Sequence, residues 1–330
     1  MAVAHAFSPK EFQVFIASDA TDAGASGIHA SNMHQLDVDS VGFPSLNVNQ
    51  VLDVRSGVGR TFKDEDFFQD NIIRVTELSI SGTLHNDTGH NLLAQNICND
   101  VSGDPSVATN HTGTSQLYGS AVTNAASSLT VVIKSSDHTN QRSLEIPGCV
   151  VTNFSVSADT GTEGGRYKFS ATLQSGVKPD LNESSTAAGN NIYANTTDMT
   201  LATASGMKVF NTSIIMQSFA LTVDHPAIFT GFTSTGYEAV SRGAECAVTV
   251  DTTIKYDGST KSFVNSFDTQ TAAQSGNMFV VVNNNAYGID VQNGVFTNVA
   301  YNEGDIMMLD CSIKAVDDGT DALVTFDITS

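Results

Sequence analysis

The segment Gly148-Cys-Val-Val-Thr-Asn-Phe-Ser-Val-Ser-Ala-Asp159 decides the fold class of this chain. One set of alternate positions along it is largely apolar and the other is mainly polar, and a turn with Gly164 and Gly165 follows. The alternation then resumes from Tyr167 to Leu173. A period of two on both arms, with glycines at the bend, predicts a long β-hairpin with one buried face. The residues predicted to point to that face are Val150, Thr152, Phe154, Val156, Ala158, Tyr167, Phe169, Ala171 and Leu173.

The same pattern occurs again near the C-terminus. It starts at Gly294-Val-Phe-Thr-Asn298, turns at Asn302-Glu-Gly-Asp305, and continues from Met307 to Ala315 with alternating apolar and polar residues. Both copies begin with glycine and apolar residues ahead of a Thr-Asn pair. A chain that repeats one hairpin in this way is predicted to contain two copies of one domain.

The elements that precede each hairpin also follow the same order. The apolar spacing predicts a strand at 75–84, a helix at 91–100 and a strand at 128–133 ahead of the first hairpin. A strand at 246–254, a helix that carries Phe263 and a strand at 278–282 precede the second hairpin. The predicted fold is therefore mainly β, with two tandem domains of the sandwich or barrel type, each with a short flanking helix.

We divide the chain into four parts on this basis. Residues 1–45 are weakly patterned and are interpreted as an extended N-terminal arm, and residues 46–177 as the first domain. Residues 178–208 show no apolar period and are interpreted as a linker or a long loop, and residues 209–330 as the second domain. The segment 102–127, rich in Gly, Ser, Thr and Asn, is predicted to be a long loop.

The composition limits the function classes. Of 330 residues, 40% are hydrophobic and 15% are charged, which is typical of a globular chain. The formal charge of −20 disfavours binding to a nucleic-acid backbone, because the phosphates would be repelled. Neither a secretory signal nor a membrane span is predicted. The four cysteines form no Cys-x-x-Cys pair and are interpreted as free thiols in a reducing compartment.

The repeated hairpins and the strands before them resemble those of the tail tube proteins, or major tail proteins, of long-tailed, siphovirus-like bacteriophages, in the type with two fused domains. In the first half the resemblance rests on Ser127-Ser-Leu-Thr-Val131, on the run from Pro147 to Asp159, and on the run from Gly165 to Leu173. In the second half it rests on Ser218-Phe-Ala-Leu-Thr-Val-Asp224 and on Gly243-Ala-Glu-Cys-Ala-Val-Thr-Val250. These motifs are patterns of strands and turns, and none is a catalytic signature.

The resemblance implies a structural virion protein without enzymatic activity and without a cofactor. Copies would join edge to edge into rings, either trimers with pseudo-sixfold symmetry, which the duplication favours, or hexamers. The rings would stack into the hollow tube of the tail, which conducts double-stranded DNA during genome ejection without binding it specifically. The other partners would be the tape measure, terminator and tip proteins of the tail. The protein would be part of the virion tail, assembled in the cytoplasm of the host bacterium.

Acidic residues on the polar faces of the expected strands are the candidate functional residues. We hypothesise that some of them line the lumen, where negative charge keeps DNA off the wall. The alternative is that they only keep outer surfaces soluble. The candidates are Glu77, Asp159, Glu245, Asp251, Asp290 and Asp310.

Neither a metal site nor a catalytic site is predicted. His85 and His90 lack a recognised ligand spacing and are interpreted as solvated loop residues. The runs Asp37-Val-Asp39 and Asp64-Glu-Asp66 could hold a hard cation but are interpreted as solvated turns, and Asp317-Asp-Gly-Thr-Asp321 as a hairpin turn. Neither Gly-x-Ser-x-Gly nor Gly-x-x-x-x-Gly-Lys occurs in the sequence.

Two other function classes stay open at this point. A carbohydrate-binding or adhesin β-sandwich on a virion or cell surface would suit the acidic turns and extended loops, although the chain has no Trp for stacking against sugars. A β-rich hydrolase is disfavoured, because no acid–base pair can be located in the sequence.

Overall fold

A computed structural model gives the fold of the chain. It describes residues 12–18, 33–44, 49–52, 67–70, 75–100, 105–107, 128–135, 143–183, 198–201, 204–231, 239–242, 245–269, 276–283 and 287–328.

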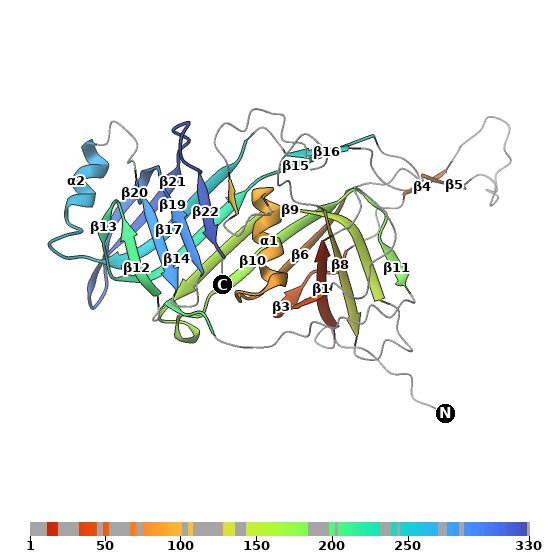
Figure 1. Ribbon diagram of the computed structural model, residues 1–330, viewed down its shortest axis with the longest axis horizontal. Coiled ribbons are helices and arrows are strands. Elements are labelled where there is room, and N and C mark those ends of the chain that lie inside the picture. The colour runs from red at the N-terminus through yellow and green to blue at the C-terminus, as the bar shows by residue number, and fades with distance from the viewer. Residues whose placement is uncertain are drawn as a thin grey trace, which may run out of the picture.

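Most strands belong to one large antiparallel sheet (Figure 1). Its main path has the order β2, β1, β8, β9, β14, β17, β21 and β20, and β10, β6, β3 and β11 join it beside β9. The bounds are β1 (Phe12–Ser18), β2 (His34–Leu36), β3 (Val38–Val41), β6 (Thr76–Thr83), β8 (Leu129–Ser135), β9 (Ser143–Asp159), β10 (Lys168–Ser175), β11 (Asp180–Glu183), β14 (Met216–Asp224), β17 (Ala247–Lys255), β20 (Gly294–Glu303) and β21 (Met307–Ala315).

A smaller sheet, two ribbons and two helices complete the described fold. The smaller sheet has the order β13 (Thr212–Ser213), β12 (Ala204–Val209), β18 (Phe279–Asn283), β19 (Gly288–Val291), β22 (Val324–Asp327) and β7 (Ser106–Val107). The two-stranded ribbons are β4 (Asn49–Leu52) with β5 (Phe67–Asp70), and β15 (Ala227–Thr230) with β16 (Ala239–Arg242). The helices are α1 (Thr88–Cys98) and α2 (Ser262–Thr269), and a 3-10 turn spans Glu163–Gly165.

The core lies between the two sheets. Phe154 of β9 meets Phe326 of β22 with ring centroids 5.8 Å apart, and Phe219 of β14 meets Phe279 of β18 at 5.7 Å. All four rings are buried and belong to one hydrophobic cluster that extends through both halves of the chain. The prediction of a mainly β protein is therefore confirmed, and burial of this cluster is its main source of stability.

Both predicted hairpins and both predicted helices are confirmed. β9 and β10 pair antiparallel, and so do β20 and β21. The first helix begins three residues earlier than expected, because Asp87 caps it by accepting a hydrogen bond from the backbone N–H of His90 at 3.0 Å. The final strand, β22, lies in the smaller sheet between β19 and β7.

One detail of the first hairpin was predicted wrongly. Thr172 pairs with Asn153 and Leu173 pairs with Val151, so Thr152 has no partner across the strand. This β-bulge shifts the alternation by one residue. As a result Val151, not Val150, shares the main core with Phe154. The side chain of Val150 packs in a separate cluster with Val177, Phe229 and Val240.

The strand pairings of the first half occur again in the second half. β1 pairs with β2 and β8, as β12 pairs with β13 and β18. β6 lies between β3 and β10, as β17 lies between β14 and β21. On its other side β10 pairs with β9, as β21 pairs with β20. The start of β9 pairs with β8 and β11, as β19 pairs with β18 and β22. A ribbon separates β3 from β6, and another separates β14 from β17.

The two halves also differ. β9 is one strand of 17 residues, whereas its counterpart is interrupted at Gln292 and Asn293, so that β19 lies in the smaller sheet and β20 in the larger one. The halves join where β9 pairs with β14, and the large sheet is continuous through both. Figure 1 shows them side by side along the long axis, with the β15–β16 ribbon over the middle and the β4–β5 ribbon at one end.

The expected four-part division stays a prediction, but several of its parts contain strands. The segment expected to be an arm contributes β1, β2 and β3 to the large sheet. β11 and β12 begin within 178–208, and β7 lies within 102–127, where only residues 105–107 belong to the described part of the chain.

Candidate functional site

One face of the large sheet is polar across seven neighbouring strands, from β6 through β10, β9, β14, β17 and β21 to β20. The other face of these strands carries core side chains such as Ile80, Val156 and Leu221. We call the first face the polar face and define it by three cross-strand rows. They are Asp159, Ser218, Thr253, Asp310 and Ala300; Lys168, Ser157, Ala220, Asp251, Ser312 and Asn298; and Ser81, Ser170, Ser155, Thr222, Thr249, Lys314 and Val295.

The carboxylates of this face are held in place by neighbouring hydroxyl and amide groups. Ser312 donates a hydrogen bond to Asp251 at 2.6 Å. Asp310 accepts hydrogen bonds from Thr253 at 2.7 Å and from Asn302 at 3.0 Å. Small side chains that are already hydrogen-bonded to one another form a hydrophilic surface with fixed negative charges, and not an apolar surface that would adsorb other molecules.

The polar face is hollowed where the two halves meet. A cavity of about 590 Å³ opens over the junction of β9 and β14 and reaches β17 and β21. Asp159, Asp251 and Asp310 line it together with Lys168 and Asn302. Its rim is therefore charged and polar, and its floor is the paired backbone of four strands.

Four of the six candidate acids lie on the polar side of the large sheet. Asp159, Asp251 and Asp310 belong to the rows above, and Glu77 of β6 is exposed and accepts a hydrogen bond from Gln174 at 3.2 Å. The spacing along each strand identified them correctly as non-core residues.

The remaining two candidates lie elsewhere. Glu245 is exposed just before β17 starts. Asp290 belongs to β19 in the smaller sheet, where burial raises the pKa of its carboxyl group although Gln292 donates a hydrogen bond to it. The sequence pattern could not separate Asp290 from the others, because alternation shows which face a residue takes but not to which sheet its strand belongs.

Lysines share the polar face with the acids. Lys168, Lys255 and Lys314 all lie on it, and Lys168 forms ion pairs with Asp39 and Glu163, each at 2.9 Å. Burial alone would lower the pKa of Lys168, but its hydrogen bonds to these two carboxylates outweigh burial and raise it. Lys168 is therefore neutralised within the chain.

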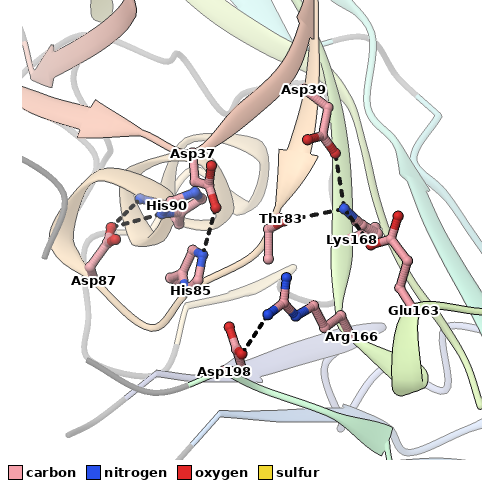
Figure 2. A network of polar contacts seen from close by, with 10 residues as sticks. All are labelled: Asp37, Asp39, Thr83, His85, Asp87, His90, Glu163, Arg166, Lys168 and Asp198. Atoms are coloured by element: carbon pink, nitrogen blue, oxygen red, sulfur yellow. Dashed lines mark hydrogen bonds and ion pairs between the residues drawn. The ribbon is translucent and has the colours of Figure 1, made fainter. Parts of the chain in front are cut away.

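A polar network ties the edge strand β3 to the rest of the first half (Figure 2). His85 contacts Asp37 at 3.1 Å, and Lys168 binds Asp39, so both carboxylates beside Val38 are held. Arg166 binds Asp198 at 2.7 Å on the neighbouring segment.

The two histidines are not solvated loop residues, and that interpretation was wrong. His85 and His90 are buried with ring centroids 5.5 Å apart, and His90 contacts Asp87 at 2.8 Å. Burial lowers the pKa of His85 despite the adjacent Asp37. Among the described residues no group of three or more His, Cys, Asp or Glu side chains could hold a metal ion.

The other acidic runs have different outcomes. The carboxylate of Asp317 accepts from the backbone N–H of Gly319 at 2.7 Å, and that of Asp318 from Thr320 and Asp321, each at 2.9 Å, so the run does form a turn. It is not a hairpin turn, because β21 and β22 on either side of it belong to different sheets. The run Asp64-Glu-Asp66 lies outside the described residues.

No protein family model matches this chain, and no curated protein matches its sequence. Within the described parts of the chain, no helix is long and apolar enough to cross a membrane. The function of the chain is therefore inferred from the polar face and its strand pairings.

Sequence reasoning missed Arg242, which joins the two halves. Its guanidinium group is buried and donates to the carbonyl oxygens of Val151 at 2.5 Å and His225 at 2.7 Å, and also to that of Asn96 in α1. A single basic residue beside a turn gives no sequence signal for such a contact, because its partners are backbone oxygens of distant segments.

Proposed function

We propose that this chain is the subunit of a hollow protein tube, the tail tube of a long-tailed bacteriophage, and that it acts as a structural protein and not as an enzyme. The polar face would line the lumen through which double-stranded DNA passes. The observation that carries this proposal is the continuous polar face across seven strands of both halves. A single sheet with one packed face and one wet, small-residue face is what the wall of an aqueous channel requires.

The repeated strand pairings support a ring of three such chains. Each chain supplies two topologically equivalent units that already pair through β9 and β14. Repeating that junction around an axis closes the sheet, removes its free edges and gives pseudo-sixfold symmetry with three chains. A hexamer of chains would instead place twelve units in each ring. The trimer agrees with the resemblance noted in the sequence, in which two-domain members use three chains per ring.

The charge of the face suits passage of DNA without binding. Five acids project from its strands, Glu77, Asp159, Asp224, Asp251 and Asp310, against three lysines, one of which is neutralised within the chain. Phosphates are repelled over about 8 Å at physiological ionic strength, so this repulsion acts at the wall and leaves the centre of a wide channel open.

Electron microscopy of the concentrated, purified protein tests the proposal. We expect rings or stacked tubes with a central channel. Particles that stay single chains at every concentration, while the protein remains folded by circular dichroism, would contradict it.

The cavity on the polar face favours one second candidate, a carbohydrate-binding module. Its volume of about 590 Å³ and its carboxylate and amide lining could accept a sugar ring. Monomeric protein that binds glycans on an array would support this candidate, whereas rings without glycan binding would support the tube.

A further inference from the structure

The sheet junction inside the chain can serve as a template for a junction between chains. β9 of the first half pairs with β14 of the second, with Val156 opposite Leu221 and both side chains fully buried. The topological counterpart of β9 is β20, and that of β14 is β3. Among the described strands, β20 pairs only with β21 and β3 only with β6, so each presents one free edge.

Two pairs of bulges fix which residues correspond. Thr152 and Thr297 are the unpaired residues of β9 and β20. Gln217 and Asp39 are the unpaired residues of β14 and β3, since the register shifts around each of them. Because a bulge marks one position of a strand, Thr297 aligns β20 with β9, and Asp39 aligns β3 with β14, residue by residue. The register of the β9–β14 pair can then be transferred to β20 and β3.

The distance in sequence from each bulge identifies the residues of β20 and β3 that correspond to Val156 and Leu221. Val156 lies four residues after Thr152, and Tyr301 lies four residues after Thr297. Leu221 lies four residues after Gln217, and Phe43 lies four residues after Asp39. Tyr301 and Phe43 are therefore the counterparts of the buried pair Val156 and Leu221.

We propose that β20 of one copy pairs antiparallel with β3 of a second copy of this chain, in the register that places Tyr301 opposite Phe43. This proposal rests on the proposed function, because it describes how the ring closes. The proposed occupant is a second copy, because a β20–β3 junction between chains would repeat the β9–β14 junction that exists within the chain.

The exposure of side chains at these edges supports the register independently. Tyr301 is 47% exposed and Phe43 is 42% exposed, although their counterparts are 0% exposed. A second contact of the β9–β14 junction also has an exposed counterpart. Tyr167 is buried, with its ring centroid 5.4 Å from that of Phe219, whereas Met307, the counterpart of Tyr167 at the start of β21, is 42% exposed. Large apolar side chains thus lie at both positions that the template requires the next copy to cover.

The edge strand β3 is already in place for this pairing. Asp37 and Asp39, on either side of Val38, are bound by His85 and Lys168 (Figure 2). The backbone N–H of Gly42 donates to Ser79 at 2.8 Å, which continues the pairing with β6 up to the residue before Phe43. A strand that is ordered before association loses little conformational entropy when a partner pairs with it.

Cysteine cross-linking tests the register. Chains with Phe43→Cys and chains with Tyr301→Cys are mixed and oxidised, because directly opposite strand residues come close enough for a disulfide. We expect covalent dimers from the mixture and none from either variant alone, and covalent trimers from the double variant. The control pairs Phe43→Cys with Ala300→Cys, whose side chain points to the other face of the sheet and should not cross-link.

A charge substitution provides a second readout. Tyr301→Asp should abolish ring formation in electron micrographs, whereas Ile228→Asp, at another exposed apolar residue, should leave it intact. Rings without the 43–301 cross-link would overturn this register and leave the proposed function standing. Cross-linked dimers that never form rings or tubes would contradict the proposed function and not the pairing.

Discussion

Thr152 and Thr297 make the same hydrogen bond at the same bulge in the two halves of the chain. The hydroxyl group of Thr152 donates to the carbonyl oxygen of Thr172, and that of Thr297 donates to the carbonyl oxygen of Ser312, both at 3.2 Å. Thr172 and Ser312 are in turn the strand partners of Asn153 and Asn298. A repeated bulge with a repeated side-chain contact indicates that the halves share detailed geometry as well as strand order.

The two bulge threonines should differ in their effect on stability. Thr152 is 7% exposed, whereas Thr297 is exposed to water. Thr152→Val should therefore lower the free energy of unfolding by about 1 kcal/mol, because the half-buried Thr172 loses the side-chain donor to its carbonyl oxygen, and Thr297→Val should lower it by less. Urea unfolding of the two variants measures this difference. Equal losses of unfolding free energy in the two variants would show that burial of the bulge does not change the contribution of its hydrogen bond.

Arg242→Met should weaken the junction between the halves. The substitution leaves the carbonyl oxygens of Val151, His225 and Asn96 without this buried donor, and we expect a loss of about 3 kcal/mol in unfolding free energy. Arg242→Lys should not restore it, because an ammonium group lacks the planar fork that reaches three acceptors. Full rescue by lysine in chemical denaturation would refute this role.

Asp290→Asn should stabilise the protein at neutral pH. Burial raises the pKa of Asp290 above its ordinary value of 3.8, so ionisation is costlier in the folded state than in the unfolded state. The carboxyl group therefore causes no loss of stability well below pH 3.8 and a loss that increases from pH 3.8 up to its folded pKa, above which the loss is constant. We expect the variant to have the higher Tm at pH 7 and the difference to shrink as the pH approaches 3.8. A pH-independent difference would contradict this account.

Charge reversal on the polar face should create binding to DNA. Asp251→Lys combined with Asp310→Lys adds positive charge where the phosphates would pass, and binding should weaken steeply as salt increases. Assembled tubes of this variant should retain double-stranded DNA at low salt, and wild-type tubes should not. The control is Asp251→Asn with Asp310→Asn, which removes charge but keeps the size of each side chain. If the lysine variant forms tubes and retains no DNA, the polar face does not line the lumen.

The sequence predicted the local elements well because their signals are local. Period-two alternation located β9, β10, β20 and β21, and the repeated Thr-Asn start lies at the bulge of both hairpins. The placement of Val150 failed, because a bulge moves one residue out of register without changing the composition of the strand.

The long-range contacts could not be read from the sequence. The strands of residues 12–41 join the large sheet through partners such as β8 that lie far along the chain, and short weakly patterned runs do not specify a partner. The same reason hid the pairing of β9 with β14, although the alternation within β9 is clear in the sequence.

A symmetry-resolved electron microscopy reconstruction of the assembled particle tests the central claim most directly. We expect three chains in each ring, a closed sheet in which β20 pairs with β3 of the next chain, and Ser155 and Thr222 directed to the channel. A particle in which these two residues point outward, or in which the β20 edge stays uncovered, would contradict it.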